Sequence, residues 1–212
     1  MKNNEPLSSL THFIGFLLSI AGLVLLIVFA SLSGTAWHIV AFSIFGTSLI
    51  LLYLASTLYH FFPKESNAKR IFRKIDYSFI YILIAGTYTP VCLTVLRGGW
   101  GWSLFGIVWA LAILGVILEL INVEVKGWVS TIIYIFMGWI ILITLLPLIN
   151  SISGKGFLIL FMGGVSYTAG AIFFALDKIV PRTRWFGMHE IFHFFVLVGS
   201  FLHFWFILKY LL

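Results

Sequence analysis

The chain has 212 residues, of which 61% are hydrophobic and 9% charged, and its formal net charge is +6. A water-soluble domain of this size cannot hide so much apolar surface, so the composition excludes a soluble protein and indicates one solvated by a bilayer. A positive charge would suggest nucleic-acid binding in a soluble protein, but here the basic residues cluster between apolar stretches. That pattern fits membrane topology and anionic lipid, and we expect no nucleic-acid partner.

Seven stretches have the length of about 20 apolar residues that a membrane helix needs. They are residues 11–32, 38–62, 76–96, 101–121, 127–149, 156–177 and 188–210. The connections between them are short, with no soluble domain and no convincing repeat. The sequence therefore predicts an all-α, polytopic membrane protein: a single domain over residues 1–212 that folds as a bundle of seven transmembrane helices.

Basic residues orient this bundle. Seven spans place the termini on opposite sides, with ten basic residues on the N-terminal side and three on the other. The ten are Lys2, Lys64, Lys69, Arg70, Arg73, Lys74, Lys126, Lys178, Arg182 and Arg184, and the three are Arg97, Lys155 and Lys209. Because cytoplasmic loops carry the excess of Lys and Arg, we expect a cytoplasmic N-terminus and an external C-terminus.

Two further features concern packing. Small residues give the span 156–177 a smooth face for close helix contact; they are Gly163, Gly164, Ser166 and Gly170. Pro90 and Pro147 are expected to kink their helices, and the carbonyls that they free need partners from neighbouring helices or water.

Ionisable residues inside spans are rare, and their default interpretation is functional. In "LASTLYHFFPK", Ser56 and His60 are one turn apart at the end of the second span; Asp76 opens the third; and in "GMHEIFHFF", His189 and His193 open the seventh. The topology returns all five to one depth in the membrane. At roughly 100° per residue, the members of each i, i+4 pair also share a helix face.

Three imidazoles at one point are typical of zinc, which takes three protein ligands and a water at catalytic sites. We expect His60, His189 and His193 to bind Zn²⁺, since three histidines favour zinc over magnesium. Asp76 would hold the water at the metal or orient a histidine, and Ser56 would bond to that water or to an oxyanion.

Other histidines have a simpler interpretation. His12, His38 and His203 are expected to be hydrogen-bonded packing residues. His203 follows His189 by 14 residues, which returns it to the same face but about 21 Å further along the axis, too far to share one ion. Glu5 and His12, near the same boundary as the cluster, are possible accessory residues together with His203.

The segment from His189 to His193 also matches H-E-x-x-H, the helix motif of zinc peptidases, in which Glu190 would be the general base. Glu190 lies about 100° around the helix from His189. Asp76 offers an acid/base group that such a peptidase would not need. An intramembrane peptidase is therefore the lesser alternative.

The motifs "STLYH", "KIDYSFIYILIAGTYTP" and "HEIFHFFVLVGSFLHF", with "EPLSSLTHFIG" at the amino terminus, resemble the hemolysin III family over essentially the whole chain. That bacterial family is related to the progestin and adipoQ receptors, including the adiponectin receptors, and to the CREST-type membrane hydrolases such as alkaline ceramidases. The resemblance implies zinc on His60, His189 and His193, Asp76 acting through the water at the metal, Ser56 close by, and an incidental Glu190.

We therefore expect a multi-pass protein of the bacterial inner (plasma) membrane that hydrolyses lipid amide or ester bonds with Zn²⁺, its partners being membrane lipids or a fatty-acyl substrate. The alternative is a non-enzymatic protein with a structural zinc: a hemolysin-like pore, or a receptor or regulator of membrane lipid homeostasis. No feature of the sequence points to a protein partner.

Overall fold

The computed structural model describes residues 5–121, 127–177, 179–181, 183 and 186–212, and this part of the chain forms helices and no β-strand. The helices are α1 (Pro6–Ser33), α2 (Ala36–Phe61), α3 (Asn67–Leu93), α4 (Gly99–Leu120), α5 (Gly127–Trp139), the 3₁₀ helix η1 (Ile140–Thr144), α6 (Leu145–Ser151), α7 (Gly154–Leu176) and α8 (Met188–Tyr210). Of the basic residues used for orientation, Lys2, Lys126, Lys178, Arg182 and Arg184 lie outside the described residues.

Length and composition identify six membrane-spanning candidates among the described residues: α1, α2, α4, the segment Val129–Ser151 that includes η1 and α6, α7 and α8. The all-helical, multi-pass membrane architecture is thus confirmed. α3 is not among the six, because Asp76 and several tyrosines and threonines dilute its apolar stretch. The count of seven spans and the orientation of the termini remain predictions.

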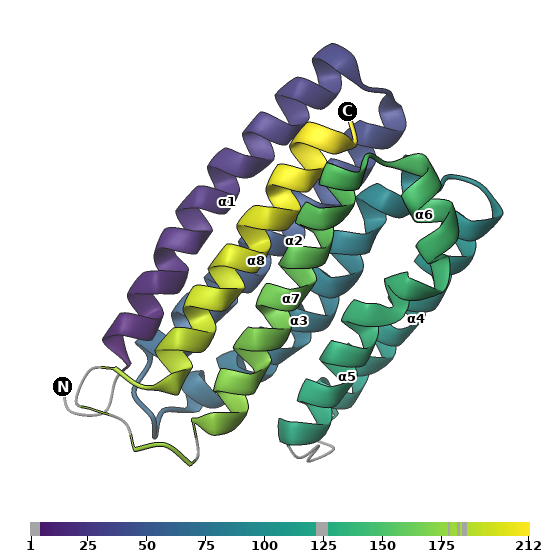
Figure 1. The fold of residues 1–212 in the computed structure, drawn as a ribbon. Helices are drawn as coiled ribbons and strands as arrows, with labels where there is room; N and C mark the ends of the chain where they lie inside the picture. Colours follow the sequence, from purple (N-terminus) through teal and green to yellow (C-terminus); the bar gives the residue numbers. More distant parts are fainter. Residues whose placement is uncertain (1–4, 122–126, 178, 182, 184–185) are drawn as a thin grey trace.

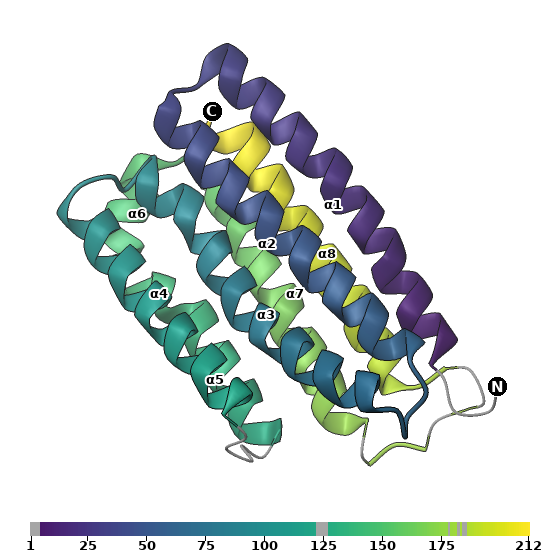
Figure 2. The ribbon, with the colours of Figure 1, turned by 180° about the vertical axis from the view of Figure 1, so that it is seen from behind.

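The helices run side by side in a bundle, with the start of α1 and the end of α8 at opposite ends (Figure 1). α1 packs against α2 and α8, and α7 packs against α8. α4 and α5 lie at the edge of the bundle away from α1, as both views show (Figures 1 and 2). We call the end at which α1 and α8 begin and α2 finishes the N-terminal end.

Small side chains allow α7 to pack closely, as the sequence predicted, and the helix that three of them contact is α8. A Cβ atom added at Gly163 would lie 2.4 Å from Cε1 of His203, and one at Gly170 would meet α8 at 3.1 Å. Ser166 Oγ donates a hydrogen bond of 2.8 Å to a main-chain carbonyl of α8. Gly164 differs, since it approaches α5 instead.

α3 begins well before the predicted span. It starts at Asn67 rather than at residue 76, because Ser66 Oγ caps it by accepting from the backbone N–H of Lys69 (3.1 Å). Lys and Arg are good helix formers, so the basic segment continues the helix although it is not apolar. At the other end, α3 continues as one helix through Pro90 to Leu93.

The predicted helix over 127–149 is not continuous. It tightens into η1 before Pro147, whose ring clashes with the carbonyl four residues earlier and which lacks an N–H. Tyr88 of α3 fills the irregular backbone: its hydroxyl donates to the carbonyls of Met137 and Gly138, each at 2.8 Å, and accepts from the N–H of Ile141 at 2.9 Å. One side chain therefore satisfies main-chain groups that have no water to bind.

Replacing Tyr88 with Phe should lower the free energy of unfolding by about 1–3 kcal/mol, because buried main-chain groups lose their hydrogen-bond partner. Thermal unfolding in detergent, with Tyr210→Phe as the control, measures this effect. The hydroxyl of Tyr210 makes no hydrogen bond within the described part of the chain. Equal melting temperatures for the two variants would contradict the role of Tyr88.

Candidate metal centre

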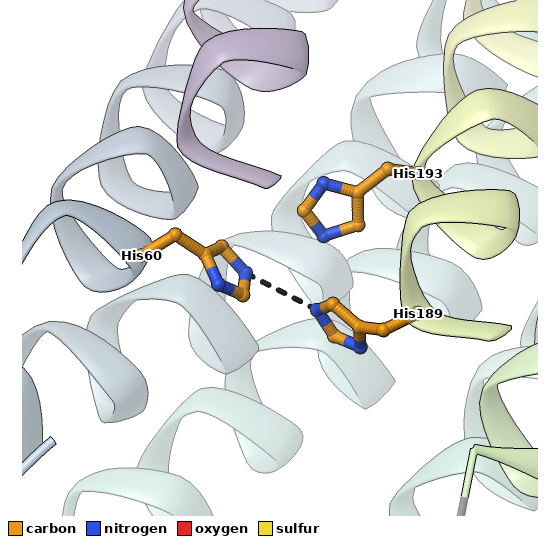
Figure 3. A group of neighbouring side chains, drawn as sticks. All are labelled: His60, His189 and His193. Carbon is orange, nitrogen blue, oxygen red and sulfur yellow. Dashed lines mark hydrogen bonds between the residues drawn. The ribbon is translucent and has the colours of Figure 1, made fainter. Parts of the chain in front are cut away.

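Three histidine side chains converge at the N-terminal end of the bundle (Figure 3). His60 lies in the last turn of α2, and His189 and His193 face it from the first two turns of α8. One ring nitrogen of each lies within 4.8 Å of the others, and the Nε2 atoms of His60 and His189 are 3.3 Å apart. Nitrogens on one tetrahedral Zn²⁺, at bonds of about 2.0–2.1 Å, are separated by about 3.3 Å. The group could therefore hold a metal ion.

Glu5, directly before α1, fixes the orientation of His60. Its Oε2 accepts from His60 Nδ1 and from Lys69 Nζ, both at 2.8 Å, and Lys64 Nζ lies 3.5 Å from Oε1. Burial opposes ionisation of Glu5, but the hydrogen bonds and charges of His60 and Lys69 outweigh it and hold its pKa below the ordinary value. A neutral histidine that donates its Nδ1–H in a hydrogen bond to a carboxylate leaves Nε2 unprotonated and able to bind a metal.

Thr11 contacts the Nδ1 atom of His193, as Glu5 contacts that of His60. The Thr11 hydroxyl donates to the carbonyl of Ser8 (2.9 Å) and lies 3.3 Å from Nδ1 of His193. Because its proton is engaged, this hydroxyl accepts from Nδ1–H, which leaves Nε2 of His193 unprotonated. The backbone N–H of His189 donates to Asp177 Oδ1 (3.0 Å), which anchors the first turn of α8.

His12 is not part of the three-histidine group but touches it. Its ring stacks on that of His193, with centroids 3.6 Å apart and planes 10° from parallel. Its Nδ1 lies 2.7 Å from Ser56 Oγ. His12 thus connects His193, a candidate metal ligand, to Ser56, the serine expected at the site.

Asp76 and Ser56 line the same cavity as the three histidines. Both are buried, and Ser56 Oγ lies 2.7 Å from Nδ1 of His12. The structure thus gathers all five residues of the predicted cluster at one end of the bundle. Their catalytic roles remain predictions.

Glu190 has a structural environment. It is buried, its Oε1 accepts from Ser8 Oγ at 2.8 Å, and its Oε2 accepts from the backbone N–H of Gly187 at 2.7 Å. The carboxylate therefore caps the start of α8 and ties it to α1. These bonds engage both oxygens that a peptidase would need to activate water.

His38 and His203 lie outside the three-histidine group. His38 Nδ1 caps α2 at Thr35, and its Nε2 reaches the carbonyl of Leu211 at 2.9 Å. His203 Nδ1 bonds to the carbonyl of Gly199 at 2.8 Å. Both histidines are hydrogen-bonded, as their interpretation as packing residues requires.

Two charged residues near the site were not singled out from the sequence. Lys69 counted only as a basic loop residue, yet it is buried on Glu5 and lies 4.6 Å above the ring of Tyr59. No local pattern signals that contact. Glu119, which accepts from Ser130 Oγ at 3.1 Å, is an ionisable residue inside a predicted span and was detectable by the reasoning used for Asp76.

A cavity of about 180 Å³ is lined by residues of α3, α5, α7 and α8, from the histidines as far as His203. Its walls are mainly apolar, with Ile80, Ile84 and Val196 among the lining side chains. The site therefore combines a three-histidine group that could hold a metal ion with a mainly apolar cavity beside it.

These features define a class: a multi-pass helical membrane protein with a three-histidine group at one end of the bundle. The chain belongs to the family described as "Haemolysin-III related", which matches residues 1–204. It is 46% identical to the "Hemolysin-3 homolog" of Bacillus subtilis (strain 168), over 97% of this chain and 93% of the relative. It is 44% identical to "Hemolysin-3" of Bacillus cereus, over 98% and 92%. The human "Monocyte to macrophage differentiation factor" is 28% identical, over 85% and 74%.

Replacing His60, His189 or His193 with Ala should remove bound metal, because two imidazoles from this group do not complete a site. Metal content per protein, measured by mass spectrometry after purification, tests this, with His38→Ala as the control that keeps the cluster. Metal content that is unchanged in all three variants would exclude the centre.

Glu5→Gln should weaken metal binding by about 10- to 100-fold without abolishing it, because the charged partner of His60 is lost. Competition with a chelator measures the affinity. The matched control is Glu65→Gln, an exposed glutamate after α2. If the two variants bind metal equally well, Glu5 does not support the site.

Proposed function

We propose that this protein binds Zn²⁺ through His60, His189 and His193 and hydrolyses amide or ester bonds of membrane lipids. The observation that carries the proposal is the three-histidine group, with His60 oriented by Glu5, at one end of an apolar cavity that also holds a buried carboxylate. Three imidazoles favour zinc among the common metals. An apolar cavity inside a membrane protein suits a fatty-acyl chain, which enters from the bilayer.

When bound at the three histidines, Zn²⁺ supplies a Lewis acid that polarises a carbonyl oxygen and makes water nucleophilic at neutral pH. Asp76 accepts the proton of the attacking water and returns it to the departing amine or alcohol, so that the proton count balances. The site needs a carboxylate for this step, and Glu190 is engaged with Ser8 and Gly187.

Ser56 stabilises the charge that develops on the carbonyl oxygen. His12 Nε2 has no hydrogen-bond partner among the described residues. A buried N–H without a partner is rarer than a buried acceptor without one, so the proton of His12 belongs on Nδ1 and is donated to Ser56 Oγ. The hydroxyl proton of Ser56 is then available to Asp76 or to the substrate.

We further infer that α3 also crosses the membrane, which raises the number of spans from six to seven, because α3 runs alongside α2 and α4 within the bundle. With seven crossings, the excess of basic residues places the N-terminus, and with it the histidines, on the cytoplasmic side. The substrate would then come from the inner leaflet of a bacterial plasma membrane.

A pore is the second candidate, favoured by the name "Hemolysin-3" of the Bacillus cereus relative. In that case the metal would be structural, since it would tie α2 to α8. The peptidase alternative has less support, because both oxygens of Glu190 hold the start of α8.

Asp76→Asn should keep the metal and lower hydrolysis of a fluorescent ceramide or acyl ester by about 100-fold or more, because the proton acceptor is lost. Turnover and metal content are measured on the same detergent-purified samples. Glu190→Gln is the comparison: a loss of activity there, with normal Asp76→Asn activity, would favour the peptidase. Dye leakage from liposomes that persists in His193→Ala would favour the pore.

A further inference from the structure

His203 lies in the last third of α8, far from the candidate metal centre but in the lining of the same cavity. Fourteen residues separate it from His189, which is about 21 Å along a helix axis. It also lines a second, adjoining chamber of about 50 Å³ beside η1, α6 and α7. The mechanism proposed above gives this buried imidazole no role.

The hydrogen bond of His203 fixes the tautomer of its ring. Nδ1 lies 2.8 Å from the carbonyl oxygen of Gly199, which can only accept, so Nδ1 carries the proton. Nε2 of the neutral ring is therefore an acceptor. It has no hydrogen-bond partner within the described part of the chain. Unlike His12 Nε2, which also lacks a partner, it is not fully buried.

The ring is also held rigidly. On one side it packs against the backbone of α7 at Gly163, where an added Cβ would lie 2.4 Å from Cε1. It also stacks on Tyr167, with centroids 5.3 Å apart and planes 17° from parallel. A side chain that is already fixed loses little conformational entropy when it binds a ligand, and this favours binding at the site.

Neighbouring polar groups already have partners. The hydroxyl of Tyr88 binds three main-chain groups of α5 and η1, and the indole N–H of Trp139 donates to Thr168 Oγ1 at 3.0 Å. Thr87 Oγ1 donates to the carbonyl of Leu83 at 2.8 Å. The other side chains named here that line the cavity near His203 already have hydrogen-bond partners. The Nε2 atom of His203 is therefore an acceptor that a ligand in the cavity can bind.

We propose that His203 binds a hydroxyl group carried on the far part of a long acyl chain, so that the cavity selects hydroxylated lipids over plain ones. The proposal rests on the function above, in that the acyl carbonyl lies at the histidines of the metal centre. A hydroxyl donates to Nε2, whereas a carboxylate offers this lone pair no donor. The separation of about 21 Å between the two sites matches a long-chain fatty acid hydroxylated at its end.

The test is competition for a bound fluorescent fatty acid in nanodiscs that contain the full, metal-loaded protein. The competitors are hexadecanoic acid, 16-hydroxyhexadecanoic acid and 2-hydroxyhexadecanoic acid, whose hydroxyl lies beside the carboxyl group. The wild type should bind the 16-hydroxy acid about fivefold more tightly than the plain acid, the effect of one hydrogen bond in an apolar site. The 2-hydroxy acid should show no such gain.

His203→Phe keeps a ring on Tyr167 but removes the acceptor, so the preference for the 16-hydroxy acid should disappear. The matched control is His38→Phe, the same substitution outside the cavity, which should keep it. If His203→Phe does not fold, Gly163→Ala displaces the ring and should reduce the preference.

Equal binding of the three acids by the wild type overturns the proposal, as does a preference that survives in His203→Phe. In both cases plain acyl binding, and with it the proposed function, would stand. If none of the acids competes, both the hydroxyl site and the acyl cavity are excluded. Lipid hydrolysis is not measured, so a protein without enzymatic activity can still confirm the hydroxyl site.

Discussion

Polar groups buried in a bilayer protein must satisfy one another, because water is absent and each unpaired group costs several kcal/mol. At the N-terminal end of this bundle, partners in α1 and directly before it meet that requirement from outside the histidine group. Glu5 and Thr11 engage the Nδ1 atoms of His60 and His193. The Nε2 atoms of His60 and His189 are then left 3.3 Å apart, a spacing that needs a proton or a cation between them. The bonds of the outer nitrogens thus leave the inner nitrogens at a point where a metal ion could bind.

The first turns of α1 consequently belong to the site. Ser8 holds Glu190, Thr11 supports His193, and His12 connects His193 to Ser56. None of these residues is part of the proposed ligand set, but Thr11 and His12 contact His193 directly. Second partners of this kind fix tautomer and ring orientation in metal sites. α1 therefore contacts both α2 and α8 at the site and holds the two helices relative to each other.

Irregular backbone borders the smaller of the two chambers, which is lined by residues of η1 and α6. The break between α5 and α6 is tolerated because the Tyr88 hydroxyl satisfies the main-chain groups that it exposes. Small residues on α7 then allow α8 to approach closely, which brings His203 against Gly163.

Several features followed from the sequence alone. Apolar length defined the helices of the bundle, and the i, i+4 spacing put His189 and His193 on one face. The family motifs agree with the match over residues 1–204. The sequence did not reveal the start of α3 at Asn67, because a capped, basic segment is helical without being apolar. Nor did it reveal the break at η1, where Pro147 acts together with a tyrosine from another helix.

The helical faces were determined by the sequence itself, because they depend on residues within a few turns of one another. The partners of the site were decided only by tertiary structure. Glu190 was open to interpretation as a catalytic base until the fold placed it against Ser8, 182 positions away in the chain. Glu5 likewise acquires its role through His60 and Lys69. Such contacts are set by how whole helices pack, and no local pattern of residues specifies them.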